Sequence, residues 1–113
     1  MSVIISPDIL LIQSKQEYAK FLKSKDLDVF AEAGELLWES LKAYLMQATK
    51  QKLDGVRAME NIAGQMGEVY NELFFHCQHF HSWYLGVGVP NDFAAEKKLY
   101  TQSLQILEKI INQ

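Results

Sequence analysis

The stretch FFHCQHFHSWY, residues 74–84, concentrates the side chains of this chain that could do chemistry. It holds all three histidines, the only cysteine and five aromatic residues. Imidazoles and a thiol at this density suit a metal centre, a catalytic site, or a packed and partly wet interface. The spacing of these residues along a helix distinguishes these kinds of site.

Residues three or four apart share a face of an α-helix, whereas residues five apart are separated by about 140 degrees. His76 and His79 therefore share a face with Glu72 and Trp83, while His81 points elsewhere. One ion cannot bind all three imidazoles of one regular helix. A helix-bundle carboxylate site also needs Glu-x-x-His, and the step from Glu72 to His76 is four residues. We therefore predict no metal site and no cofactor, and expect the histidines to cap a core stripe or to form a wet interface.

Cys77 and His81 are four residues apart, which places them on one helix face as a Cys–His nucleophile pair requires. Cys77 falls on the apolar stripe, however, and buried thiols are usually inert. Other catalytic signatures are absent: there is no Gly-Lys-Ser/Thr phosphate loop, no Gly-x-Ser-x-Gly elbow, and GVGVPN follows a predicted helix instead of a strand. The sequence therefore predicts no catalytic residues.

Length and charge restrict the class of protein. With 113 residues the chain has the size of one domain, so we expect a single domain over residues 1–113. Its net charge of -3 offers no attraction to a nucleic-acid backbone, which disfavours nucleic acid as a partner. A single cysteine forms no internal disulfide, and MSVIISPD lacks the basic start and long apolar run of a signal peptide. These features predict a cytoplasmic protein.

Residues 73–91 form a stretch without Asp, Glu, Lys or Arg that is long enough to cross a bilayer. The same stretch contains three histidines, a glutamine, two glycines and a proline. Moving that much polarity into hydrocarbon would cost several kcal/mol. We therefore expect no membrane interaction.

Apolar residues recur every three to four positions in four segments, and no strand-like alternation occurs. The predicted helices begin at Pro7, after Asp26 or Asp28, at Val56, and after Asn91 or Asp92, and they end near Lys25, Gly55, Tyr84 and Ile111. Ser6 is the expected cap of the first helix. Long neighbouring helices joined by short turns must run antiparallel. The expected fold is therefore all-α, an up-and-down antiparallel four-helix bundle.

Gly34, Gly64 and Gly67 lie inside the predicted helices, where each glycine costs about 1 kcal/mol relative to alanine. A compensating gain is close approach of a neighbouring backbone or a large ring. We interpret these glycines as packing notches. The rings available to fill them are Trp38, Phe74 and Trp83.

Two segments resemble a known family. FLKSKDLDVFAEAGELLWESLKAYL joins the end of one helix, through a Lys-Asp turn, to a second helix with a tryptophan, and FHSWYLG places a histidine before an aromatic pair. Over about residues 10–112 the chain resembles the archaeal PaREP-type family, small proteins related to HEPN-like helical bundles. The resemblance implies a HEPN-like bundle, with His81 in the family's histidine position and Trp83 and Tyr84 as its aromatic pair.

The chain departs from the family's pattern in three ways. It has one residue fewer between the histidine and the aromatic pair, and Glu39 and Ser40 follow Trp38 where the family has small residues. Nuclease-competent HEPN bundles also carry an arginine followed, after four to six residues, by a histidine that acts with it at the scissile phosphate. The only arginine here, Arg57, is far from all three histidines in sequence. The resemblance thus implies the bundle while arguing against ribonuclease activity.

We therefore expect a non-catalytic HEPN-like module that forms a homodimer and binds a protein partner or a nucleotide-like ligand. Self-complementary aromatic surface near the end of the third predicted helix favours this interpretation. The binding or interface candidates are His76, His79, His81, Trp83 and Tyr84. The alternative is a degenerate, metal-independent ribonuclease in which His76 and His81 act as base and acid in place of the missing pair.

Overall fold

The computed structural model describes residues 5–113, and within them the chain is all-α with no strand. The five helices are α1 (Pro7–Ser24), α2 (Leu27–Thr49), α3 (Val56–Met66), α4 (Glu68–Tyr84) and α5 (Phe93–Ile111). The all-helical prediction is confirmed for these residues. Residues 1–4, which entered the signal-peptide argument, lie outside the described part of the chain.

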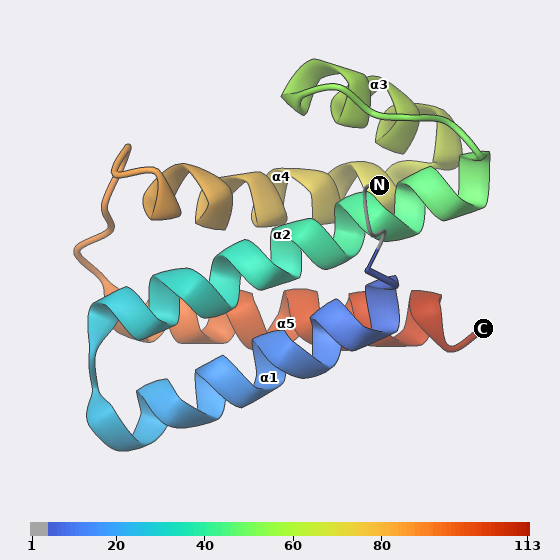
Figure 1. The fold of residues 1–113 in the computed structure, drawn as a ribbon. Helices are drawn as coiled ribbons and strands as arrows, with labels where there is room; N and C mark the ends of the chain where they lie inside the picture. Colours follow the sequence, from blue (N-terminus) through green and yellow to red (C-terminus); the bar gives the residue numbers. More distant parts are fainter. Residues whose placement is uncertain (1–4) are drawn as a thin grey trace.

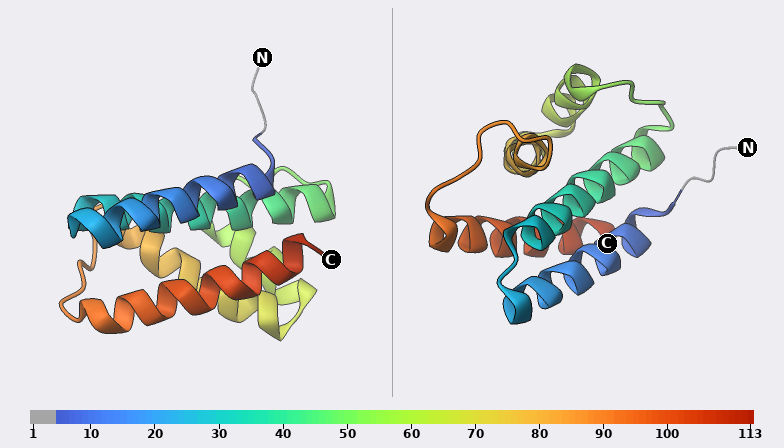
Figure 2. Two further views of the ribbon diagram at one scale, coloured as in Figure 1. Left: turned by 90° about the horizontal axis from the view of Figure 1, so that it is seen from below. Right: turned by 60° about the vertical axis from the view of Figure 1, so that its left-hand side comes forward.

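In the view of Figure 1, α1, α2, α4 and α5 run from side to side, and α3 lies over the start of α4. Figure 2 shows that α4 crosses α5 at a wide angle. Consecutive members of the set α1, α2, α4 and α5 run in opposite directions, and α2 packs against both α1 and α4. In the left view of Figure 2 α5 lies below α1 and α2, and in the right view α2 crosses in front of it. The α1–α2 and α4–α5 connections therefore lie at the same end of the molecule.

The predicted third helix over residues 56–84 is wrong, because Gly67 divides it into α3 and α4. Gly67 has φ 132° and ψ 174°, a conformation that glycine adopts far more readily than residues with a side chain. The chain reverses there, so that α3 folds back over the start of α4 (Figure 1). Gly67 is therefore a helix break and not the packing notch that its position suggested.

The end of α2 also differs from the prediction. The helix stops at Thr49, whose Oγ1 donates to the Leu45 carbonyl at 2.7 Å, and Lys50 closes it with φ 57°. Leu53 then turns into the core, with an exposed fraction of 4%. Gly55, expected to end α2, instead precedes α3.

Two of the predicted N-caps are formed by side chains. Asp26 accepts from the Asp28 amide at 2.9 Å, and Asp92 accepts from the Ala95 amide at 3.1 Å. Ser6 occupies the cap position of α1, but its side chain makes no capping hydrogen bond. The aspartates thus fix where α2 and α5 begin.

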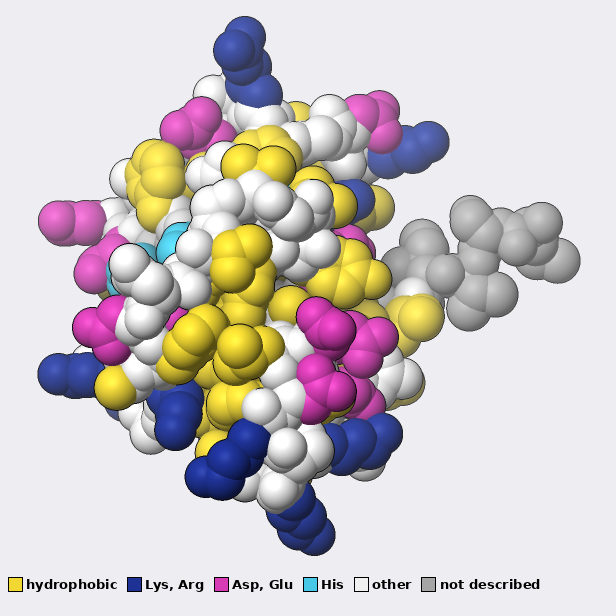
Figure 3. Space-filling view, turned by 90° about the vertical axis from the view of Figure 1, so that its left-hand side faces the viewer, with side chains coloured by type: hydrophobic (Ala, Val, Ile, Leu, Met, Phe, Trp, Pro, Cys, Tyr) yellow, Lys and Arg dark blue, Asp and Glu magenta, His cyan; other side chains and the backbone are white. Residues whose placement is uncertain are grey.

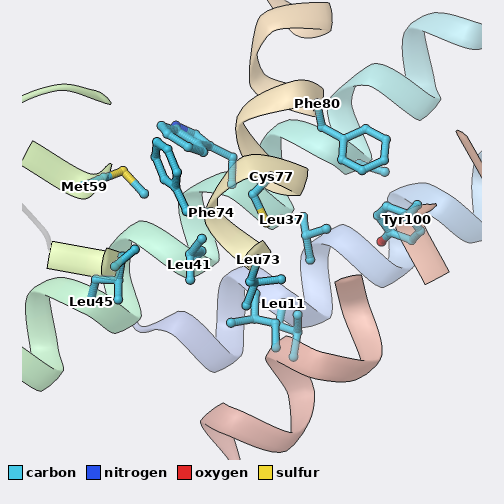
Figure 4. Close-up of a cluster of buried hydrophobic side chains, with 14 of the residues drawn as sticks. Leu11, Leu37, Leu41, Leu45, Met59, Leu73, Phe74, Cys77, Phe80 and Tyr100 are labelled. Carbon is cyan, nitrogen blue, oxygen red and sulfur yellow. The ribbon is translucent and has the colours of Figure 1, made fainter. Parts of the chain in front are cut away.

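The core consists of large side chains from the predicted stripes of α2, α4 and α5, joined by Leu11 of α1 and Met59 of α3 (Figure 4). Leu22, expected in the stripe of the first helix, is 52% exposed. The side chains with no exposed surface include Leu37, Leu41, Leu45, Leu73, Phe74, Cys77, Phe80, Tyr100 and Leu107. These residues hold α4 in place from Leu73 to Phe80.

Gly34 confirms the expected notch, although a different ring fills it. A Cβ on Gly34 would lie 2.7 Å from the Cβ of Phe80, so α2 and α4 approach closely at this point. Phe80 therefore occupies the space for which Trp38, Phe74 and Trp83 were the predicted candidates.

A buried polar group joins three helices. The Ser14 hydroxyl of α1 donates to the Ala33 carbonyl of α2 at 2.7 Å and lies 2.7 Å from the Tyr100 hydroxyl of α5. Because Ser14 donates to the carbonyl, Tyr100 donates to Ser14. These groups are satisfied internally, which makes the network structural.

None of the helices in residues 5–113 has the length and apolar character needed to cross a membrane.

Candidate functional site

The three histidines of α4 contact different partners. His76 Nδ1 lies 3.4 Å from the Ser103 hydroxyl of α5. His79 Nε2 lies 2.7 Å from Glu96, also of α5, whereas His81 Nδ1 lies 2.8 Å from Glu35 of α2. The imidazoles therefore diverge, as the spacing in the sequence predicts, and share no common centre.

His79 is hydrogen-bonded to a carboxylate that is largely removed from water. The Glu96 side chain is 11% exposed, and that of His79 is 38% exposed. Glu96 lies in the first turn of α5, where a negative charge is also stabilised by the helix dipole. The pair joins the C-terminal half of α4 to the start of α5.

His81 lies between an acid and an indole. Its ring stacks on Trp38 of α2 with centroids 4.6 Å apart and planes at 12°. Burial raises the pKa of the Glu35 carboxyl more than the hydrogen bond from His81 lowers it, and neighbouring Glu39 raises it further. His81 thus joins α4 to α2, on the opposite side from His79.

The predicted aromatic pair is divided between the interior and the surface. Trp83 is 6% exposed and packs on Phe30 and Phe93, with ring centroids 5.0 and 6.0 Å away. Tyr84 is 46% exposed. Of the five candidate binding residues, Trp83 is therefore a core residue, and Tyr84 is the most exposed aromatic side chain at this end of α4.

The structure gives no support to metal or thiol chemistry. No group of three or more His, Cys, Asp or Glu side chains in the described residues could hold a metal ion. Cys77 is fully buried, and burial raises the pKa of its thiol well above the ordinary value. Cys77 therefore does not act as the thiolate nucleophile of a Cys77–His81 pair at neutral pH.

His76 borders an open groove between α4 and α5 with a volume of about 390 Å³. The groove is lined by Glu72, His76, Gln102, Gln105, Ile106, Glu108 and Lys109. Glu108 is already paired with Lys15 of α1 at 2.8 Å. Lys109 is the single cationic residue in this lining, against two carboxylates, so the groove is a poor receptor for a phosphate.

An exposed apolar surface lies at the C-terminal end of α4, and of its residues only Tyr84 was predicted from the sequence as an interface residue. We call Leu27, Tyr84, Leu85, Val87 and Val89 the end face; their exposed fractions lie between 40% and 65%. Figure 3 shows hydrophobic side chains gathered at the centre of this end of the molecule. The signal was present in LGVGVP, whose valines belong to no core stripe.

A polar groove of about 400 Å³ adjoins the end face through Tyr84. We call it the acidic groove; it is lined by Gln13, Gln16 and Glu17 of α1, Glu32, Glu35 and Leu36 of α2, and Tyr84. Carboxylates cluster beside the hydrophobic centre in Figure 3. This arrangement repels phosphates and attracts cationic side chains.

Comparison with known proteins gives one partial similarity. No family model matches the chain, and no solved structure matches it. Over 62 residues the chain is 36% identical to a Glutamate--tRNA ligase of Clostridioides difficile (strain 630). That similarity spans 55% of this chain and 13% of the ligase, so the chain matches only a small part of that relative.

Proposed function

We propose that the chain is a non-catalytic, cytoplasmic helical module that forms a homodimer and binds a protein partner. One observation carries the proposal: the imidazoles are engaged within the fold, while the apolar end face is exposed. An exposed apolar patch on a small domain is typical of an interaction surface. The two carboxylates beside His76 and those of the acidic groove favour a protein over a nucleotide-like ligand.

We also propose that α1, α2, α4 and α5 form a HEPN-like up-and-down bundle, with α3 as an additional element, and that the chain is a PaREP-type relative. The alternating direction of these four helices supports this assignment (Figure 1). Ligase activity lies outside the proposed function, because the similarity covers 13% of the Glutamate--tRNA ligase.

Homodimer formation is tested by sedimentation velocity on the full chain from low to high micromolar concentration. We expect the mass to rise to twice that of the monomer as concentration increases. A constant monomer mass across this range contradicts the proposed homodimer.

The alternative function, a metal-independent ribonuclease, requires His76 and His81 to act on one phosphate. Their side chains instead bind α5 and α2, respectively, which opposes this role. We expect no cleavage of single-stranded RNA above a buffer blank in the presence of chelator. Cleavage that is lost in both His76→Ala and His81→Ala would establish the ribonuclease in place of the non-catalytic module.

A further inference from the structure

Backbone hydrogen bonds hold part of the end face in place. The amides of Leu85, Gly86 and Val87 donate to the carbonyls of His81, Trp83 and Ser82 at 3.1, 2.9 and 2.9 Å, respectively. Residues 85–87 are thus fixed to the end of α4, with the side chains of Leu85 and Val87 exposed. A surface ordered in advance loses little conformational entropy when a partner covers it.

Opposite charges flank this apolar surface. The acidic groove lies on one side, with Glu17 and Glu32 among its lining residues. The end of α1 supplies cations and an apolar side chain; Lys20, Leu22, Lys23 and Lys25, which we call the basic tip, are all exposed. Figure 3 shows carboxylates beside the hydrophobic centre and Lys or Arg side chains below it.

The basic tip is complementary to the acidic groove. Lys20 is bonded to Glu17 of its own chain at 2.8 Å, whereas Lys23 and Lys25 form no ion pair within the described residues. In a twofold dimer the same surface of each copy meets the other, so a surface with an acidic side and a basic side can pair with itself. Such pairing brings the tip of each copy to the groove of the other.

We infer that the end face is the surface on which a second copy of this chain docks, with the basic tip of each copy against the acidic groove of the other. This inference rests on the homodimer of the proposed function. It adds where the interface lies and how the two copies are oriented relative to each other. The apolar centre supplies the desolvated contact, and the flanking charges fix the relative orientation of the two copies.

The apolar part is tested with the double variant Val87→Asp/Val89→Asp, measured by sedimentation velocity. Val69→Asp, at a comparably exposed valine at the opposite end of α4, is the matched control. We expect the double variant to be monomeric and the control to dimerise like the wild type, with equal helical circular dichroism. A folded double variant that still dimerises overturns the end-face inference while leaving the homodimer intact.

The charged part is tested with Lys23→Glu and Glu32→Lys. Each variant alone places like charges opposite each other twice across the twofold axis, and we expect its dimer to weaken by at least about tenfold. In an equimolar mixture, the mixed dimer has the reversed charge pair in one contact and the native pair of Lys23 with Glu32 in the other. The mixture should therefore restore dimer formation.

Two results overturn the predicted orientation: wild-type affinity in either single variant, or no recovery of the dimer in the mixture. A wild-type protein that stays monomeric at every concentration contradicts the proposed homodimer itself. The failure of the orientation is thus distinguished from the failure of the proposed function.

Discussion

At the scale of single residues, the histidines of residues 74–84 mainly connect α4 to the neighbouring helices α2 and α5. His76 and His79 contact α5, and His81 contacts α2. The imidazoles therefore make contacts on two sides of one helix. Helix geometry predicted that they diverge. Their partners Glu96 and Glu35 could not be predicted, because they lie on other helices whose rotation about their axes is set only by packing.

Replacement of His79 tests how much one of these contacts contributes. His79→Ala leaves the mostly buried Glu96 carboxylate without its imidazole partner, and we expect a loss of about 1–3 kcal/mol in the free energy of unfolding. His76→Ala is the comparison, because its 3.4 Å contact with Ser103 is long and should contribute less. Urea unfolding measures both. Equal losses in the two variants would contradict the assigned role of Glu96.

Burial of Glu35 makes stability depend on pH. Because its pKa is raised in the folded protein, the folded state binds this proton more tightly than the unfolded chain does. The free energy of unfolding should therefore decrease as pH rises from the ordinary carboxyl pKa through the raised value. Glu35→Gln should remove this decrease, whereas Glu60→Gln, at an exposed carboxylate of α3, should preserve it. Identical pH dependence of unfolding in wild type and Glu35→Gln would contradict this.

At the scale of helices, hydrophobic periodicity predicted most of the core positions, with exceptions such as the exposed Leu22 and Leu27, but not every helix boundary. The stripe continues from Met59 through Ala63 to Leu73 without revealing that the chain reverses at Gly67. A glycine inside a periodic segment is compatible with a packing notch, as at Gly34, or with a break, as at Gly67. A notch and a break are distinguished only in the folded structure, by Phe80 packed against Gly34 and by the φ of 132° at Gly67.

The two remaining helical glycines give a matched pair of substitutions. Gly34→Ala forces its Cβ against Phe80 at 2.7 Å, and we expect a loss of about 1–3 kcal/mol in stability from overpacking. At Gly64 the nearest atom to an added Cβ is Asn71 Oδ1 at 3.8 Å, so Gly64→Ala should stabilise α3 by up to about 1 kcal/mol. Thermal unfolding of both variants checks the signs. A stabilised Gly34→Ala would show that α2 and α4 are not in close contact there.

At the scale of the whole molecule, stability depends on a single core to which all five helices contribute. Leu41 lies in this core without exposed surface. Leu41→Asp buries an unpaired charge, a cost that is large compared with a total stability of about 5–15 kcal/mol. We expect loss of helical circular dichroism at room temperature, with Gln47→Asp, on the exposed side of α2, remaining folded. A cooperatively folded Leu41→Asp variant would contradict the assigned core.

The surface of the whole molecule was the part least accessible from the sequence. Trp83 and Tyr84 were predicted together as interface residues, yet one is 6% and the other 46% exposed. Adjacent helical residues point about 100 degrees apart, so they rarely share an environment. The end face and the acidic groove come from side chains far apart in the sequence, which only the packing of α1, α2 and α4 brings together.

The amide chemical shifts of isotope-labelled wild-type protein, recorded by NMR over a dilution series, test the interaction account most directly. We predict concentration-dependent shifts for residues 20–27 and 84–89, and constant shifts for α3 at the other end of the molecule. Shifts that do not change with concentration anywhere, or that change only in α3, would contradict a dimer formed through the end face.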